Sequence, residues 1–231
     1  MASAVIVAAG SGTRMRINKA KQYLILDGKS ILEKTLDVFD ACEFIDDIVL
    51  VLPEQDVDEW ENKLRARRKK YKVVCGGASR TESSFNGIKA VSGQNEVVVI
   101  HDGVRPFVTT EQIKEVIQTA NLNGAATLAL KSKDTVKIVD WENRNVKNTL
   151  DRDEIALIQT PQAFKLHLIV RAYKSAIEDN LNYFDDCSLI EKIGGKVKIV
   201  EGSPMNIKIT VPEDLELAKF FCRRDFEKAA N

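Results

Sequence analysis

Short apolar segments alternate with segments of helical periodicity along most of this chain of 231 residues. The apolar segments are rich in valine, isoleucine and leucine, which predicts strands at 5–9, 48–52, 72–75, 97–100 and 126–130. Between them, apolar residues recur every three or four positions, which predicts helices at 31–41, 57–68, 81–91 and 111–121. This alternation predicts an α/β, Rossmann-like architecture: a mainly parallel, twisted sheet with helices on both faces.

The pattern changes near residue 132, where two polar, alternating segments follow at 134–139 and 146–150. They are too polar for the centre of a sheet, so we expect a protruding β-hairpin arm at approximately 132–155, within a single domain of residues 1–231. An exposed hairpin needs a surface to pack against, and a second copy of the chain is the economical partner. The remaining pattern predicts helices at 166–178 and 188–193, strands at 196–200 and 206–210, and a last helix from about 212.

Composition and length argue against several classes of function. The chain has 34 basic and 34 acidic residues, and this neutral balance argues against nucleic-acid binding, which needs a basic field. The four cysteines include no Cys-x-x-Cys pair, which favours reduced thiols in a cytoplasmic protein over zinc or disulfides. We expect no signal peptide, and no apolar run is long enough to span a membrane. The only histidines, His101 and His167, are too few for a three-histidine metal site, and we assign neither to catalysis.

The first predicted strand runs into a loop that suits phosphate. Gly10 and Gly12 expose backbone N–H groups at the start of a helical segment, where the amides and the helix dipole favour an anion. Two cations, Arg14 and Lys21, follow within reach and suit the neutralisation of a triphosphate. The dinucleotide-binding motif Gly-x-Gly-x-x-Gly is excluded because Met15 stands where its third glycine would be. The phosphate-binding loop motif of Walker-type nucleoside triphosphatases is also absent.

Two further clusters follow the ends of other predicted strands. Gly76 and Gly77 let a flat base approach the backbone, and Ser83 suits a hydrogen bond to a base edge. At the next strand end, Asp102 suits a substrate hydroxyl or Mg²⁺, and Arg105 suits a phosphate. The alternative for this pair is an internal ion pair that shapes the turn.

Ordered motifs connect nearly the whole chain to one family. From about residue 4 to 220 the sequence resembles the 2-C-methyl-D-erythritol 4-phosphate cytidylyltransferases, through AAGSGTRM, KQYL, GGASRTESS, HDGVRPF, DTVK, TLDR, QTPQAF, DDCSLIE, EGSPMNIKIT and PEDLELA in that order. The resemblance implies that CTP and a sugar-alcohol phosphate, methylerythritol phosphate, form CDP-methylerythritol and pyrophosphate with Mg²⁺ as cofactor, in non-mevalonate isoprenoid precursor synthesis.

The resemblance also implies roles for individual residues. The cations that would stabilise the transition state are Arg14, Lys21 and Lys208. The residues that would line the CTP site, beside Gly12 of the first loop, are Ala8, Ala9, Gly10, Gly77 and Ser83. The residues that would hold the sugar phosphate are Asp102, Arg105, Thr135, Arg152 and Thr160. Of these, Thr135 and Arg152 would be supplied across a homodimer by the hairpin arm.

The sequence departs from the family pattern at three places. Ala20 stands where proline is usual, Ala78 stands where an acidic residue is usual, and HDGVRP replaces HDAARP. The last departure is similar to the ribitol 5-phosphate cytidylyltransferases, so ribitol 5-phosphate is the alternative substrate, whereas DTVK and TLDR favour methylerythritol phosphate. Two other classes remain: a nicotinamide-dependent oxidoreductase, which Met15 disfavours, and a silent nucleotide sensor, which the intact cations disfavour.

The implied reaction needs no general base. Its nucleophile is a phosphate monoester oxygen, whose second pKa of about 6 leaves it largely ionised at neutral pH. Catalysis then consists of positioning two anions and neutralising their charge. A site of cations without a catalytic histidine is what this chemistry requires.

Overall fold

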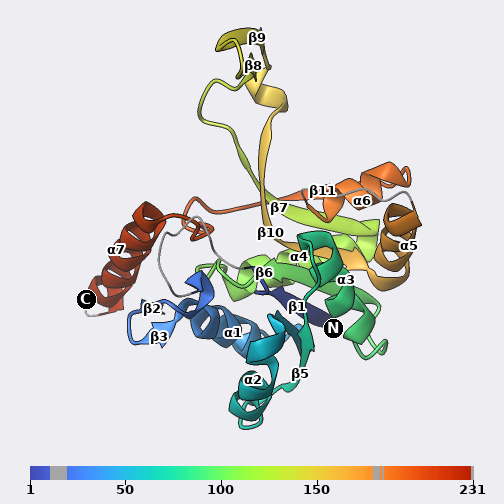
Figure 1. The fold of residues 1–231 in the computed structure, drawn as a ribbon, viewed down its shortest axis with the longest axis vertical. Coiled ribbons are helices and arrows are strands. Elements are labelled where there is room, and N and C mark those ends of the chain that lie inside the picture. Colours follow the sequence, from blue (N-terminus) through green and yellow to red (C-terminus); the bar gives the residue numbers. More distant parts are fainter. Residues whose placement is uncertain (11–19, 179–182, 184, 230–231) are drawn as a thin grey trace.

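Seven strands form one sheet in the computed structural model, which describes residues 1–10, 20–178, 183 and 185–229. The strand order is β11-β7-β10-β6-β1-β4-β5 (Figure 1). Their bounds are β1 Ala2–Val7, β4 Ile45–Leu52, β5 Lys70–Cys75, β6 Val97–Asp102, β7 Ala125–Lys131, β10 Ala156–Lys165 and β11 Lys198–Glu201. Neighbouring strands are parallel except β10, which runs antiparallel to both β6 and β7. The expectation of a mainly parallel α/β sheet is confirmed.

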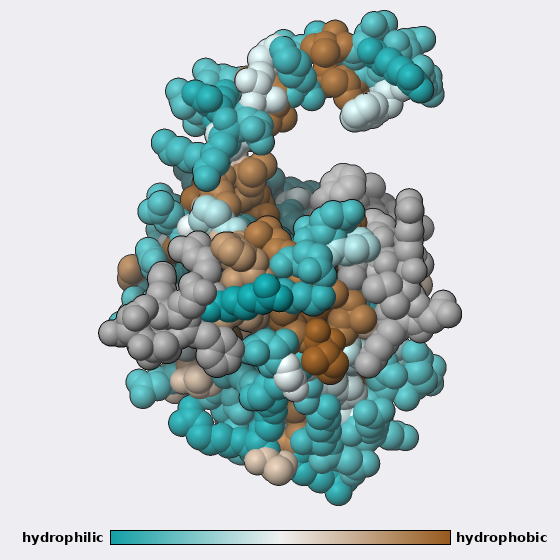
Figure 2. Space-filling view, turned by 90° about the vertical axis from the view of Figure 1, so that its left-hand side faces the viewer, coloured by the Kyte–Doolittle hydropathy of each residue, from teal (hydrophilic) through white to brown (hydrophobic). Residues whose placement is uncertain are grey.

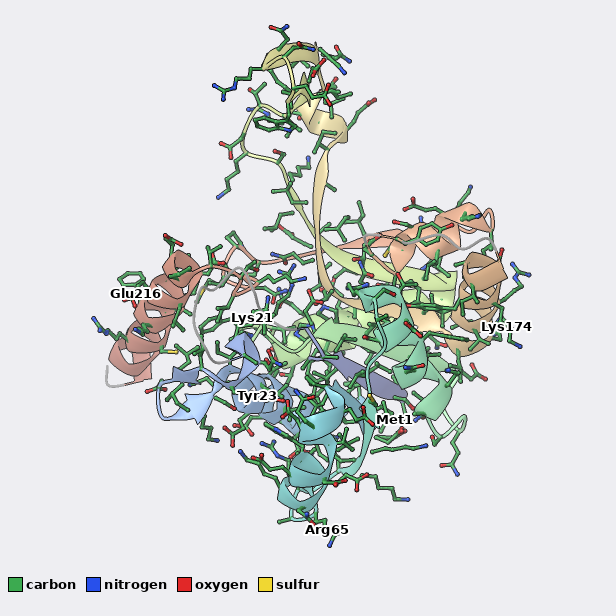
Figure 3. All side chains as sticks on the ribbon, viewed as in Figure 1. Met1, Lys21, Tyr23, Arg65, Lys174 and Glu216 are labelled. Atoms are coloured by element: carbon green, nitrogen blue, oxygen red, sulfur yellow. The ribbon has the colours of Figure 1, made fainter. Side chains whose placement is uncertain are left out.

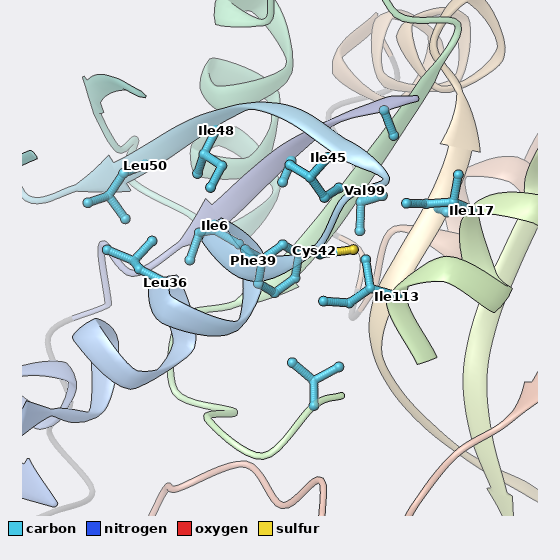
Figure 4. Close-up of a cluster of buried hydrophobic side chains, with 14 of the residues drawn as sticks. Ile6, Leu36, Phe39, Cys42, Ile45, Ile48, Leu50, Val99, Ile113 and Ile117 are labelled. Atoms are coloured by element: carbon cyan, nitrogen blue, oxygen red, sulfur yellow. The ribbon is translucent and has the colours of Figure 1, made fainter. Parts of the chain in front are cut away.

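Helices cover both faces of this sheet. They are α1 Ile31–Ala41, α2 Val57–Leu64, α3 Arg80–Ala90, α4 Thr110–Asn123, α5 Leu166–Glu178 and α6 Cys187–Lys192. The last helix, α7 Pro212–Ala229, lies to one side of the sheet, where it packs with Leu26 and Ile31 (Figure 1). Ile6 of β1 packs with residues of α1 and α4 on one face, including Phe39 and Ile113 (Figure 4). The neighbouring Val5 belongs to the cluster of α3, α5 and α6 on the other face. Successive side chains of one strand therefore enter two cores, which explains why the central strands are apolar throughout.

Helix starts follow the sequence signals. Ser30 and Glu33 form a reciprocal capping box at the start of α1, and Thr109 and Gln112 form another at the start of α4. Helix α1 has the predicted bounds, α5 also has them, and α2 ends at Leu64, four residues earlier than predicted. Among the described residues, no helix is both long and apolar enough to cross a membrane.

Within the described residues, the second half of the chain contains one strand that was missed and lacks one that was expected. Strand β10 was not predicted, because it contains Pro161 and buries polar side chains, and its pairing with β7 shifts between Ile158 and Gln162. The strand expected at 206–210 is not a strand. That segment is irregular, and its Ile209 N–H donates to the carbonyl of Val104 outside any ladder.

The predicted hairpin arm is confirmed as a protrusion. Its strands β8 Lys137–Asp140 and β9 Asn145–Thr149 form a separate two-stranded sheet, followed by the 3₁₀ turn η4 Arg152–Glu154. The arm leaves the body between β7 and β10 and stands away from it (Figures 1 and 2). It exposes apolar side chains, with Trp141 83% accessible and Val146 59% accessible.

Candidate active site

A cleft of about 420 Å³ opens at the carboxyl ends of β1, β5 and β6. The described residues that line it come from five places in the sequence: Val7–Gly10, Lys21 and Gln22, residues 77–80 with Ser83, Asp102 and Val104, and Lys208. The carboxyl edge of a parallel sheet is where α/β folds bind ligands, because several loops converge there. The sequence motifs that precede different helices thus meet at one site.

The loop after β1 is fixed by its backbone. The Ala8 N–H donates to Val51 O at 2.9 Å, and the buried side-chain amide of Gln22 donates to Ala8 O at 2.9 Å. Gln22 belongs to the 3₁₀ turn η2 Lys21–Tyr23, so the same turn places Lys21 at the cleft (Figure 3). The predicted residues Gly12 and Arg14 lie outside the described residues.

The second glycine pair is required by close packing, against the first loop at Gly76 and against the start of helix α3 at Gly77. A Cβ atom on Gly76 would lie 2.4 Å from Ala9 Cβ, and one on Gly77 would lie 2.3 Å from Glu82 Cγ. The Ser83 hydroxyl accepts from the Gly77 N–H at 3.0 Å and donates to Ser79 O at 2.8 Å. Ser83 therefore lines the cleft while it holds the Gly77 loop in place. Its predicted contact with a base edge stays a prediction.

Asp102 is the electrostatic centre of the cleft. Its Oδ2 lies 2.9 Å from Lys208 Nζ and 3.4 Å from Arg105 Nε, and its Oδ1 lies 3.8 Å from Arg80 Nε. Burial opposes ionisation of this carboxyl, but the charges of Lys208, Arg80 and Arg105 outweigh it and hold its pKa well below the ordinary value. The internal Asp102–Arg105 pair considered from the sequence is present, and it is one part of a larger cluster.

His101 and Thr160 form hydrogen bonds to the backbone of Asp102 and Arg105. His101 Nε2 lies 3.1 Å from Arg105 O, so that nitrogen carries the proton, and Nδ1 accepts from the Thr160 hydroxyl at 3.0 Å. The same hydroxyl accepts from the Asp102 N–H at 3.1 Å. Burial lowers the pKa of His101 to about 4, so the ring is neutral at pH 7. This geometry gives His101 a structural role, in agreement with the expectation that it is not catalytic.

The chain matches known proteins over nearly its whole length. The pattern of the 2-C-methyl-D-erythritol 4-phosphate cytidylyltransferase family matches residues 2–224. The chain belongs to this family. The relative from Clostridium botulinum bearing that name is 42% identical over 97% of this chain and 100% of its own length. The relative of the same name from Caldanaerobacter subterraneus is 43% identical over 96% of this chain and 99% of its own length.

Solved structures agree with the family assignment. The 4-diphosphocytidyl-2C-methyl-D-erythritol synthase of Anaerococcus prevotii superposes with a TM-score of 0.85 at 38% identity, over 96% of this chain and 98% of that one. The Francisella tularensis cytidylyltransferase gives a TM-score of 0.80 at 32% identity, over 95% of this chain and 98% of that one. As a member of the cytidylyltransferase family, the chain is a nucleotidyltransferase enzyme.

The fold brings most of the residues predicted from the sequence together at the cleft. The predicted residues that line the cleft are Ala8, Ala9, Gly10, Lys21, Gly77, Ser83, Asp102 and Lys208. Arg105 and Thr160 lie behind Asp102 and contact it. Thr135 and Arg152 are exposed on the arm and are not part of the cleft lining that the structure describes.

Sequence reasoning missed Arg80, which lines the cleft. It stood in the quoted motif GGASRTESS, but no role was given to it. Its position was a signal, because a cation as the first residue of helix α3 opposes the helix dipole. Such a placement is stable when acidic partners are near, and Arg80 has two, Asp186 and Asp102.

Proposed function

We propose that this cleft is the active site in which the enzyme transfers a cytidylyl group from CTP to 2-C-methyl-D-erythritol 4-phosphate. The products are CDP-methylerythritol and pyrophosphate, in isoprenoid precursor synthesis by the non-mevalonate route. The supporting observation is the convergence of Lys21, Lys208 and Asp102 on one cleft in a chain that matches the family from residue 2 to 224. We place the reaction in the cytoplasm, since all four cysteines are unpaired thiols.

The reaction is an in-line displacement between two anions. A phosphate oxygen of methylerythritol phosphate attacks the α-phosphorus of CTP, the new P–O bond forms, and the bond to the β-phosphate breaks with release of pyrophosphate. Lys21, Lys208 and Arg14 neutralise the charge that gathers on the α-phosphate oxygens and the leaving group. His101 is no candidate base, because its Nε2–H is donated to a carbonyl and its ring is buried.

The two substrates occupy different parts of the cleft. CTP lies along the loop Ala8–Gly10 and against Gly77 and Ser83, where backbone N–H groups and small residues permit close approach. The sugar phosphate lies toward Asp102 and Lys208, with Arg105 and Thr160 fixing the Asp102 backbone and carboxylate. In this proposal CTP and the acceptor bind next to each other, at the carboxyl ends of neighbouring strands.

Mg²⁺ fits this site as a companion of the nucleotide. Within the described part of the chain, no three side chains of the types that ligate metals come together. Asp102 is the one carboxylate in the described cleft lining, and one carboxylate with several phosphate oxygens is a donor set that Mg²⁺ accepts. When bound, the ion would neutralise phosphate charge, and Asp102 is the residue placed to contact it.

The arm completes the site of a second copy in our proposal. Thr135 and Arg152 are exposed on an arm that stands away from the body, so they suit a sugar phosphate bound by a partner subunit. A groove of about 720 Å³ at the base of the arm includes Ile199, which is 61% accessible. Leu157, on β10 near the same base, is 50% accessible. These apolar surfaces favour a homodimer formed through the arm.

The test is Mg²⁺-dependent release of pyrophosphate from CTP, with methylerythritol 4-phosphate and ribitol 5-phosphate compared in parallel. We expect release with methylerythritol phosphate, for which the relatives above are named. Release with ribitol phosphate alone would show that the acceptor is ribitol 5-phosphate, the alternative substrate suggested by the HDGVRP motif. If neither substrate gives pyrophosphate release, the proposed reaction is wrong, although the assignment of the fold is unaffected.

A further inference from the structure

Arg80 connects the cleft to a buried carboxylate, Asp186, which is not among the described residues that line the cleft. Its Nη2 lies 2.7 Å from Asp186 Oδ2, while its Nε lies 3.8 Å from Asp102 Oδ1. The two acidic residues belong to different parts of the fold, since Asp102 ends β6 and Asp186 precedes α6. The guanidinium therefore spans the distance between a substrate-facing carboxylate and a structural one.

The contacts of Asp186 hold its carboxylate in place beside Arg80. It is 1% accessible, and its Oδ1 accepts a hydrogen bond from the hydroxyl of Tyr173. Its backbone N–H donates to Gln162 Oε1 at 3.1 Å. Tyr173 is itself fully buried and stacks on Phe85, with ring centroids 5.1 Å apart. The anchor is thus rigid, and little freedom remains for the guanidinium.

The contact with Asp102 goes beyond what a structural ion pair needs. Arg80 and Asp186 already form a balanced pair of opposite charges, so burial alone does not require a second carboxylate. The two oxygens of Asp102 are also divided: Oδ2 contacts Lys208 and Arg105, whereas Arg80 is the cation that the described contacts place on Oδ1. With Asp186 included, the cluster contains three cations and two carboxylates. It therefore has a surplus positive charge that an anionic ligand can neutralise.

We propose that Arg80 is a positioning residue that acts through Asp102 and keeps Lys208 available for substrate phosphate. Arg80 fixes Oδ1 and supplies positive charge that remains beside Asp102 when the ammonium of Lys208 turns to a phosphate oxygen. Without Arg80, the carboxylate attracts Lys208 more strongly, and fewer molecules present the ammonium to the substrate. This inference rests on the proposed function for its substrate, but its central relationship, between Arg80, Asp102 and Lys208, is testable by anion binding alone.

The first experiment is a double-mutant cycle read by binding of inorganic pyrophosphate in calorimetry. We expect Arg80→Gln to weaken binding by about tenfold, a scale typical of one lost charge-assisted contact. Asp102→Asn should strengthen binding, and it should do so several times more in the Arg80→Gln background than in the wild type, because Asp102 holds Lys208 more strongly when Arg80 is absent. An equal effect of Asp102→Asn in both backgrounds would overturn the proposal.

The second experiment measures steady-state turnover of the same variants. Arg80→Gln should raise KM for methylerythritol phosphate and lower kcat, with a combined loss of about 10²-fold in kcat/KM. Asp186→Asn should give a smaller loss in the same direction, because Arg80 remains but its anchor is weakened. Values for Arg80→Gln within twofold of wild type would also overturn the proposal.

Two controls keep the outcomes separate. Arg65→Gln removes an exposed arginine far from Lys21 and should change neither readout (Figure 3). Arg80→Lys keeps the charge beside Asp186 and should recover part of the binding, which protects the test if Arg80→Gln folds poorly. If the wild type itself shows no turnover, the proposed reaction fails, whereas the pyrophosphate cycle still decides the role of Arg80.

Discussion

The ammonium of Lys208 lies 2.9 Å from the carboxylate of Asp102, although the two residues come from opposite halves of the chain. Asp102 ends a central strand, and Lys208 lies on an irregular segment that crosses the same sheet edge. The contact places a partly exposed cation beside a buried, ionised carboxylate. Removing either group changes the charge that a phosphate meets in the cleft.

Lys21 should be essential for turnover. We expect Lys21→Ala to lower kcat by at least ~10²-fold, the scale for losing one preorganised donor to a developing charge. The same loss is expected for Arg14→Ala, on the basis of the family resemblance. Lys174→Ala, which alters an exposed lysine on α5, serves as the control and should leave kcat unchanged. Near-normal turnover of Lys21→Ala in the pyrophosphate assay would contradict the assignment of the cleft.

The arm should act on the partner subunit. Arg152→Ala and Lys208→Ala should each be inactive alone, since one lacks an arm residue and the other a cleft residue. Co-expression in equal amounts should restore about a quarter of wild-type activity, because half of the dimers are mixed and each mixed dimer has one intact site. If the arm served its own cleft, the mixture would stay inactive.

His101 should make stability depend on pH below neutrality. Its folded pKa of about 4 lies below its ordinary value, so the unfolded chain takes up a proton first as the pH falls. The free energy of unfolding should therefore be highest above about pH 6.5 and decrease by up to roughly 3 kcal/mol as the pH falls toward 4. Chemical denaturation at several pH values measures this slope.

The two histidines provide matched variants for that measurement. His101→Gln should flatten the dependence between about pH 4 and 6.5, whereas His167→Gln, on the exposed face of α5, should retain it. A slope that survives in His101→Gln would show that other groups produce it.

The capping box of α1 should contribute to stability without affecting catalysis. The Ser30 hydroxyl accepts from the Glu33 N–H at 3.2 Å, and the Glu33 carboxylate accepts from the Ser30 N–H at 2.8 Å. Ser30→Ala should lower the free energy of unfolding by about 1 kcal/mol. It should leave kcat within twofold of wild type, because Ser30 is not among the described residues that line the cleft. Urea denaturation and the pyrophosphate assay check the two parts, and a stability change below a few tenths of a kcal/mol would contradict the first.

Local signals were sufficient for most elements. The apolar strands β1, β4 and β6 and the helices α1 and α4 follow from periodicity and capping residues, which act within a few positions of the sequence. Strand β10 was missed for the opposite reason. Its polar residues are stabilised by distant partners: Gln162 donates to Asp185 at 3.0 Å, and Gln159 donates to Ser203 O at 2.9 Å. No local pattern contains those partners.

The sequence by itself determined the α/β order, the protruding arm and, through its ordered motifs, the family. Periodicity and turn chemistry are local, and motif order survives without knowledge of contacts. Only the tertiary structure decided that Arg80 lies between Asp186 and Asp102, and that Lys208 reaches Asp102 from a segment that is not a strand. Such relationships depend on distances of a few ångströms between residues far apart in the chain. Their electrostatic effect exists only once folding has brought the charges together and excluded water from them.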